Sequence, residues 1–353
     1  MTTVYDLSLD ELAARLTPWG EPAFRAKQLH TQLWRRAATY EQMSDLSPAL
    51  RERLSEELPL GVEVLTVRTA DRGATRKALL RLGGSHIIET VLMGYRDRVT
   101  VCVSSQVGCA MDCGFCATGQ MGLQGNLSPG EIAAQVVWAK REAAALPAST
   151  PQRLTNVVFM GMGEPLANYA RVRAAIERII APDGVHLGAR HLTVSTVGLV
   201  PGIRKLTEHL PQVNLAVSLH AATDELRDQL VPINKKYPLG VLERAMADWR
   251  RSTRRRPSIE WAMIADTNDT DEQAGALAAL AYRLGAHVNL IPLNPTPGWP
   301  TQPSTPERIK LFVRILKAGG VNVTVRDTRG REIDAACGQL RLEHDAASGA
   351  GEG

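Results

Sequence analysis

Three of the five cysteines, Cys109, Cys113 and Cys116, share one short loop and have the spacing C-x3-C-x2-C. Thiolates at this spacing, in a loop that also contains Gly108 and Gly114, can ligate three of the four irons of a cubane. The fourth iron then stays open to another ligand, whereas four cysteines would close the cluster. The spacing therefore predicts an open 4Fe–4S cluster.

Other cysteine chemistries fit this loop less well. A structural zinc site usually takes four ligands in two pairs, and the second pair is missing. A disulfide scaffold does not suit a 353-residue chain without a secretory signal. Single buried cysteines are common, but three so close together are not. Cys102 precedes the loop, at the expected end of a strand, and Cys337 lies near the far end of the chain.

The bulk properties of the chain set only broad limits. The length of 353 residues allows one large domain or two ordinary ones, and 44% hydrophobic with 22% charged residues is typical of a globular protein. A net charge of +4 permits a nucleic-acid partner without requiring one. No signal peptide and no apolar span of 18 residues is found, so we expect a cytoplasmic protein without membrane contact.

Residues 1–60 have the pattern of a small helical domain. Ser8 and Glu11 form a capping box at the start of one helix, Pro22 begins a second, and a third follows Ser47. Residues 61–97 then change to short antiparallel strands, which form a β extension. Glu89 lies inside one of these strands; alternation favours a solvent-facing carboxylate, and the alternative is a carboxylate placed for proton transfer.

From residue 98 to 327, strands and helices alternate. We expect strands at 99–104, 154–161, 190–196, 213–219, 258–264, 287–292 and 321–326, and helices at 129–145, 168–180, 200–209, 239–252, 272–284 and 305–318. Such alternation implies right-handed parallel units. About six full units are present, fewer than the eight of a closed barrel. The predicted fold is therefore α/β, a partial (β/α)6 TIM-like barrel with its active site at the carboxyl ends of the strands.

Polar or glycine residues follow four of these strands. Gly163 and Glu164 follow the second, in the run Gly161–Pro165, and Ser195 ends the third. The fourth ends in Ser218, Leu219 and His220, with Ser218 and His220 on one strand face, and Asn294 follows the sixth. A Gly-x-Gly run alone also fits a tight turn, and a lone buried histidine is usually structural. Together, these residues predict a ligand site at the strand ends.

Five segments carry a resemblance to a known family: CVSSQVGC at 102–109, GMGEP at 161–165, SLHA at 218–221, IPLN at 291–294 and CGQL at 337–340. From about Leu9 to Leu340 the chain resembles the RlmN/Cfr family of radical S-adenosylmethionine (SAM) RNA methyltransferases. The resemblance implies a 4Fe–4S cluster held by three cysteines plus SAM, and two SAM molecules per turnover. It implies SAM contacts at Gly163, Glu164, Ser195, Ser218, Leu219, His220 and Asn294.

The resemblance also implies a two-cysteine mechanism. Cys337, in a C-terminal loop at 328–342, would carry a methyl group as S-methylcysteine, and Arg329 and Arg331 could lower the pKa of its thiol. A 5′-deoxyadenosyl radical would activate that methyl for addition to C2 of adenine. Glu89 would accept a proton, and Cys102 would release the RNA through a transient disulfide with Cys337. Residues 343–353 are expected to be a disordered tail.

By the same resemblance, the substrates are adenine 2503 of 23S rRNA and adenine 37 of tRNAs. C8 methylation of the same rRNA adenine, as in the Cfr branch, is the nearest alternative, and a non-enzymatic iron–sulfur or zinc RNA-binding module is the alternative from another class. We expect a monomer that takes electrons from a flavodoxin or ferredoxin, with an RNA-contacting N-terminal domain. Basic residues offer further RNA contacts: Arg72, Arg76, Lys77, Arg250, Arg251, Arg254, Arg255 and Arg256.

Overall fold

The structure is a computed structural model that describes residues 2–296, 298–299 and 301–326. Cys337, Arg329 and Arg331 lie outside the described residues. The chain divides into two compact units. The first comprises the residues up to Val107 with Gly125–Gly161 and Ala170–Leu192, and the second comprises Gly108–Gln124, Met162–Tyr169 and the described residues from Thr193 onward.

The first unit begins with three helices, α1 (Leu9–Leu16), α2 (Phe24–Trp34) and α3 (Pro48–Glu57). The predicted capping box is present, because the Ser8 hydroxyl accepts from Glu11 N and the Glu11 carboxylate accepts from Ser8 N. Ser47 caps α3 with its hydroxyl alone, which accepts from Leu50 N. Each of the three helices buries apolar residues: Leu12 of α1, Leu29, Leu33 and Trp34 of α2, and Leu54 of α3.

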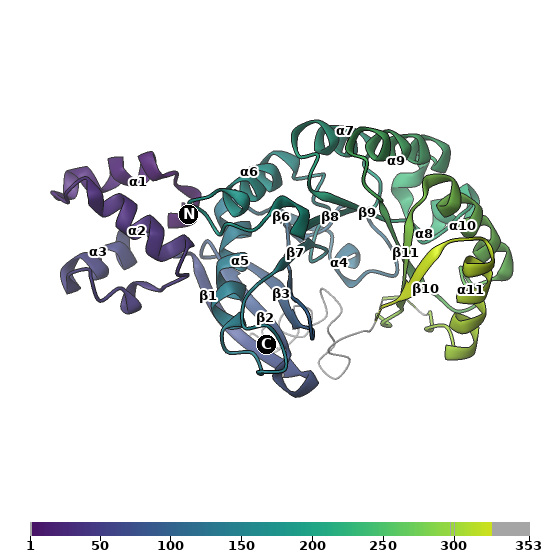
Figure 1. Cartoon of the computed structure of the whole chain (residues 1–353), viewed down its shortest axis with the longest axis horizontal. Coiled ribbons are helices and arrows are strands. Elements are labelled where there is room, and N and C mark those ends of the chain that lie inside the picture. The colour runs from purple at the N-terminus through teal and green to yellow at the C-terminus, as the bar shows by residue number, and fades with distance from the viewer. Residues whose placement is uncertain (1, 297, 300, 327–353) are drawn as a thin grey trace, which may run out of the picture. The chain divides into compact units, whose positions relative to one another are not determined.

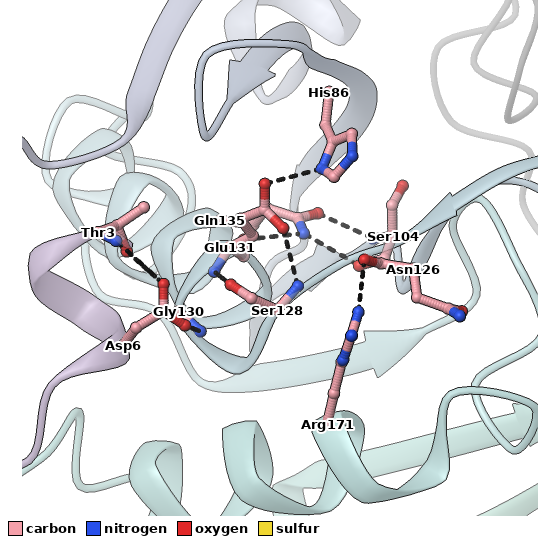
Figure 2. Close-up of polar contacts among 10 residues, drawn as sticks. All are labelled: Thr3, Asp6, His86, Ser104, Asn126, Ser128, Gly130, Glu131, Gln135 and Arg171. Carbon is pink, nitrogen blue, oxygen red and sulfur yellow. Dashed lines mark hydrogen bonds and ion pairs between the residues drawn. The ribbon is translucent and has the colours of Figure 1, made fainter. Parts of the chain in front are cut away.

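A long helix, α5 (Pro129–Ala143), joins the other parts of the first unit. The Asp6 carboxylate accepts from Gly130 N at 2.7 Å, and a Cβ at Gly130 would lie 2.5 Å from Asp6 Cγ. A glycine at this position therefore lets the N-terminal segment approach the first turn of the helix. Figure 2 shows this hydrogen bond together with the Glu131 carboxylate, which accepts a hydrogen bond from Ser128 N and contacts His86 Nδ1 at 2.8 Å.

The strands of this unit run in the order β1 (Val62–Ala70), β2 (Thr75–Leu82), β3 (His86–Gly94), β4 (Val99–Cys102) and β7 (Asn156–Phe159). The first four pair antiparallel, and β4 pairs parallel with β7. Thr90 of β3 donates from its hydroxyl to Gln135 of α5 at 2.7 Å. The helix therefore covers the face of the sheet to which Thr90 points, and Glu89 and Val91 point to the other face.

The second unit contains five strands in sequential order and parallel to one another: β8 (Leu192–Thr196), β9 (Asn214–Ser218), β10 (Ser258–Met263), β11 (His287–Pro292) and β12 (Asn322–Val325). The helices between them are α7 (Val200–His209), α9 (Leu239–Thr253), α10 (Asp271–Leu284) and α11 (Pro306–Ala318), which lie along the outer side of the strands in Figure 1. Trp261 of β10 packs against Phe312 of α11, with ring centroids 5.9 Å apart. The alternate residue Glu260 therefore points away from the helices.

The predicted strands and long helices of residues 98–327 are all found, with end points shifted by up to a few residues. The prediction missed the short helices α4 (Ala117–Gln120) and α8 (Asp224–Leu230) and the two-stranded pair β5 (Gln106–Gly108) and β6 (Leu123–Asn126). These elements are too short to show a clear periodicity. Among the described residues, no helix has the length and apolar character needed to cross a membrane.

Candidate active site

The three clustered cysteines lie in the turn that follows β5. Gly108 has φ +72°, and a Cβ there would lie 1.8 Å from Gly122 O. Only glycine therefore allows Cys109 N to donate to Gly122 O at 2.9 Å, which closes the base of the loop. Inside the loop, Cys116 N donates to Cys113 O at 2.9 Å. The loop is thus fixed by its own backbone.

An apolar cluster of the second unit surrounds Cys113, which is only 6% exposed. The buried members of the cluster are Ala221, Leu230, Val231, Ala262, Ile264 and Leu293. The Trp299 ring covers the loop, since a Cβ at Gly114 would lie 2.0 Å from it. Cys113 therefore lies in a region shielded from water, whereas Cys109 and Cys116 are partly exposed.

The chemistry of the three thiols fits a cluster. All three are free of disulfides. Burial raises the pKa of Cys109 to about 12 and that of Cys113 well above its ordinary value, and the neighbouring thiols add to both shifts. Bound iron would offset this cost by stabilising the thiolates. No three His, Cys, Asp or Glu side chains of the described residues are arranged to hold a single metal ion, and a cubane spreads its ligands more widely than one ion does.

The glycine-rich run is positioned by Glu164. This side chain is 2% exposed, and its two oxygens accept from Leu166 N and from Val197 N, each at 2.9 Å. Burial raises the pKa of Glu164 to about 7, against the opposing effect of these hydrogen bonds. The carboxylate therefore ties the run to the end of β8. Gly163 has φ +97°, a conformation that favours glycine.

Ser195 and Ser218 lie on adjacent strands, and their hydroxyl oxygens are 3.3 Å apart. Asn294 follows β11, as predicted, and is half-buried. Leu219 is a core residue, so only its backbone is polar: Leu219 N donates to Glu260 O, and Leu219 O accepts from Arg227 Nε. The second unit thus gathers hydroxyl groups at the carboxyl ends of β8 and β9, as the sequence predicted.

His220 is placed differently from the prediction. It lies beyond the end of β9 with φ +61°, so it does not continue the strand face of Ser218. Its Nδ1 accepts from Ala262 N at 3.0 Å, which leaves the proton on Nε2, and its ring lies edge-on to Phe115. Burial, with a smaller effect of Arg227, lowers the pKa of His220 to about 3. The ring is therefore neutral at ordinary pH.

Two buried polar residues that sequence reasoning missed hold these strand ends. Arg227 of α8 is fully buried and donates to Val197 O at 2.6 Å and to Leu219 O at 3.0 Å, so it joins the ends of β8 and β9. Asn268 donates to His220 O at 2.8 Å and to Ala262 O at 2.7 Å. Neither residue belongs to a motif, and Arg227 sits in a short, highly charged run that resembles a solvated helix.

In the first unit, Cys102 and Glu89 share one face of the sheet. Cys102 lies opposite Val91 on β3, and Lys77 of β2 lies opposite Val91 on the other side. Glu89 is 1% exposed and contacts Lys77 Nζ at 3.1 Å. The interpretation of Glu89 as solvent-facing is therefore wrong, because its side chain is buried and paired with Lys77. Lys77 is likewise no RNA contact, since its side chain is fully buried.

Comparison with known proteins agrees with this arrangement. Residues 103–280 match the model of the radical SAM superfamily, and residues 2–59 match that of the ribosomal RNA large subunit methyltransferase N-terminal domain. A crystal structure of a radical SAM methyltransferase from Sphaerobacter thermophilus has a TM-score of 0.90 and 47% identity, and covers 96% of this chain and 99% of that one. The predicted radical SAM α/β fold is confirmed.

Curated relatives share about half of the sequence. A probable dual-specificity RNA methyltransferase RlmN from Salinispora tropica is 54% identical over 340 residues, covering 94% of this chain and 91% of the relative. The protein of the same name from Chloroflexus aurantiacus is 50% identical over 349 residues, covering 97% and 93%. Such identity over nearly the full length, with both family models matched in order, places the chain in the RlmN family of the radical SAM superfamily.

Proposed function

We propose that the protein methylates C2 of adenine in RNA, with adenine 2503 of 23S rRNA and adenine 37 of tRNAs as its substrates. The relatives are named as dual-specificity RNA methyltransferases, which supports an RNA substrate. The observation that carries the proposal is the division of the described cysteines into two sets. Three lie in one loop that packs against an apolar cluster, and Cys102 is buried separately at the end of β4.

Cys109, Cys113 and Cys116 would hold a 4Fe–4S cluster, which would supply the one-electron reduction of SAM. Two SAM molecules would be used per turnover. The strand ends of the second unit would orient SAM through Ser195, Ser218, Asn294, Gly163, Glu164, Leu219 and His220. The apolar cluster around Cys113 would keep water from the reacting atoms.

The second cysteine set would handle the methyl group. Cys337 would carry it and become joined through its methylene carbon to C2 of adenine. Cys102 would then attack the Cys337 sulfur and break the bond between that sulfur and the methylene carbon, which releases the RNA and leaves a Cys102–Cys337 disulfide that thiol exchange clears. Glu89 would accept the C2 proton. It lies on the same sheet face as Cys102, and the buried Lys77 ammonium offsets the charge of its carboxylate. The strand register puts both side chains on one face of the sheet, which supports these two roles.

We also propose roles for the domains, an oligomeric state and an electron donor. The helical domain at 1–60 would contact RNA, followed by the β extension at 61–97, the barrel at 98–327 and the methyl-carrier loop at 328–342. The protein would act as a monomer and accept electrons from a flavodoxin or ferredoxin. We take C2 rather than C8 as the target carbon because the relatives are named RlmN.

A reconstituted reaction tests the proposal. Protein with an anaerobically rebuilt cluster is incubated with SAM, reductant and protein-free 23S rRNA or tRNA, and the RNA is digested for mass spectrometry. We expect 2-methyladenosine. Formation of 8-methyladenosine would show that the protein methylates C8 rather than C2 at the same site. If SAM is cleaved but no methyladenosine forms, the proposal of an RNA substrate is wrong.

Two variants test the cysteine roles. Cys337→Ala should abolish methylation while the iron content stays at the wild-type level. Cys102→Ala should accumulate a covalent protein–RNA adduct that denaturing gel electrophoresis detects. Cys109→Ala is the matched control, because it should lose the cluster and form no adduct. A fully active Cys337→Ala protein would end the two-cysteine mechanism.

A further inference from the structure

A basic surface lies at the opposite end of the second unit from the candidate site. The strands β8 to β12 are parallel. The residues that precede the strands therefore gather at one end of the sheet, and the residues that follow the strands gather at the other end. The SAM-site residues follow strands. The run Arg254–Arg256 precedes β10, and Gly320 precedes β12. The arginine run therefore cannot belong to the SAM site.

These residues surround a pocket of about 580 Å³. Its basic lining consists of Arg250, Arg254, Arg255 and Arg256. Gly285, with φ +55°, ends α10, and a Cβ there would lie 2.6 Å from the Arg250 guanidinium. The glycine thus leaves room for this guanidinium, which is held in the wall of the pocket. Four arginines on one concave surface are an arrangement suited to anions.

The positive charge extends beyond this pocket. A neighbouring hollow of about 470 Å³ shares Arg250 and Arg254 and adds Arg251 and Arg283. Carboxylates pair with the last two, Asp248 with Arg251 and Glu243 with Arg283. Among the described residues, no carboxylate forms an ion pair with Arg250, Arg254 or Arg256. The C-terminal ends of α9, α10 and α11 lie nearby, and each contributes only about half a negative charge. A net positive field therefore remains.

An exposed aromatic ring stands beside the arginines. Tyr282 lines the pocket and is 68% exposed, and Gly320, with φ +73°, would place a Cβ only 3.4 Å from its ring. The Tyr282 ring is therefore open to contact with a ligand beside the arginines. Guanidinium groups bind phosphates, and an aromatic face stacks on unpaired bases, so this combination is suited to single-stranded nucleic acid rather than to a small anion.

We propose that this arginine pocket is a second RNA-binding site, at which a single-stranded segment of the substrate places its phosphates on the arginines and stacks a base on Tyr282. This inference depends on the proposed function in one respect, namely that the substrate is RNA. The site holds RNA remote from the target adenine, so its loss weakens binding and raises KM without changing the chemical step.

The test compares two double variants of equal charge change. Arg254→Gln/Arg256→Gln removes two exposed pocket arginines, and Arg244→Gln/Arg314→Gln removes two exposed arginines of the same unit that do not line the pocket. Fluorescence anisotropy measures the affinity for a labelled tRNA transcript over a range of salt concentrations. Each single-stranded phosphate contact contributes about 0.7 to the salt slope, or about fivefold in affinity at 0.1 M salt.

The pocket variant should therefore lose about 1.4 from the salt slope and about 25-fold in affinity at 0.1 M salt, whereas the control variant keeps wild-type binding. Tyr282→Leu should weaken binding about tenfold with an unchanged salt slope. Equal binding by the two double variants would overturn the second site. Methylation assays judge the proposed function separately, because wild-type protein that binds tRNA through the pocket but makes no methyladenosine would refute the activity alone.

Discussion

The Lys77 ammonium lies 3.1 Å from the Glu89 carboxylate, and both side chains are fully buried. Two strands supply this pair, since Lys77 lies opposite Val91 and Glu89 is two residues away on the same face of β3. Desolvating two charges usually costs as much as their attraction returns. The pair therefore adds little stability, and its place on the sheet face of Cys102 supports the proposed role of Glu89 as proton acceptor.

Breaking the pair should destabilise the protein strongly. Lys77→Met leaves the Glu89 charge buried without its cation, and we expect a loss of about 3–5 kcal/mol in the free energy of unfolding, measured with urea. The double variant Lys77→Met/Glu89→Gln removes both charges and should recover most of that loss while remaining inactive. An active double variant would exclude Glu89 as the proton acceptor.

The cysteine loop depends on one of two nearby glycines. Gly108 and Gly122 both have positive φ, but only a Cβ at Gly108 would collide, 1.8 Å from Gly122 O. Gly108→Ala should therefore open the base of the loop and lower the iron bound after reconstitution several-fold. In Gly122→Ala the added Cβ would meet no atom within 4 Å. This variant should therefore lose only about 1 kcal/mol of unfolding free energy, from backbone strain. Equal iron content in both variants would contradict this account.

The sequence was informative where function imposes a local pattern. Cysteine spacing located the loop, and apolar strands followed by polar residues located Ser195 and Ser218, because parallel strands place their carboxyl ends together. Alternation failed at Glu89, since period-2 patterning reports solvent only when one sheet face is exposed. No local signal marks its partner Lys77, which is twelve positions away on a neighbouring strand.

The positive φ of His220 was also invisible in the sequence. Its imidazole accepts from Ala262 N and its carbonyl from Asn268, and both partners come from elements more than 40 positions away. Arg227 was missed for a related reason. Its three acceptors come from separate elements, and the charged run around it is typical of a solvated helix. Buried polar contacts between distant segments are fixed by the fold, not by local periodicity.

Removal of Arg227 should disturb the SAM site and the fold together. Its guanidinium satisfies Val197 O, Leu219 O and Asn234 Oδ1. Arg227→Met leaves these buried acceptors unpaired, and we expect a loss of about 3 kcal/mol or more in unfolding free energy and weaker SAM binding by equilibrium dialysis. Arg204→Met, on the exposed surface of α7, is the control and should change neither quantity. An unchanged SAM affinity in Arg227→Met would show that this residue does not contribute to the SAM site.

His220 should make the protein less stable in mild acid. Its pKa falls from 6.5 to about 3 on folding, so the unfolded chain binds more protons between these values and stability drops as pH falls through that range. Between roughly pH 7.5 and pH 5 the expected loss is about 2 kcal/mol. His220→Asn keeps an acceptor for Ala262 N but cannot titrate, so its unfolding free energy should depend less on pH by that amount. His191→Asn, at an exposed position, should behave as wild type. An equal pH dependence in wild type and His220→Asn would show that the imidazole becomes charged in the folded protein.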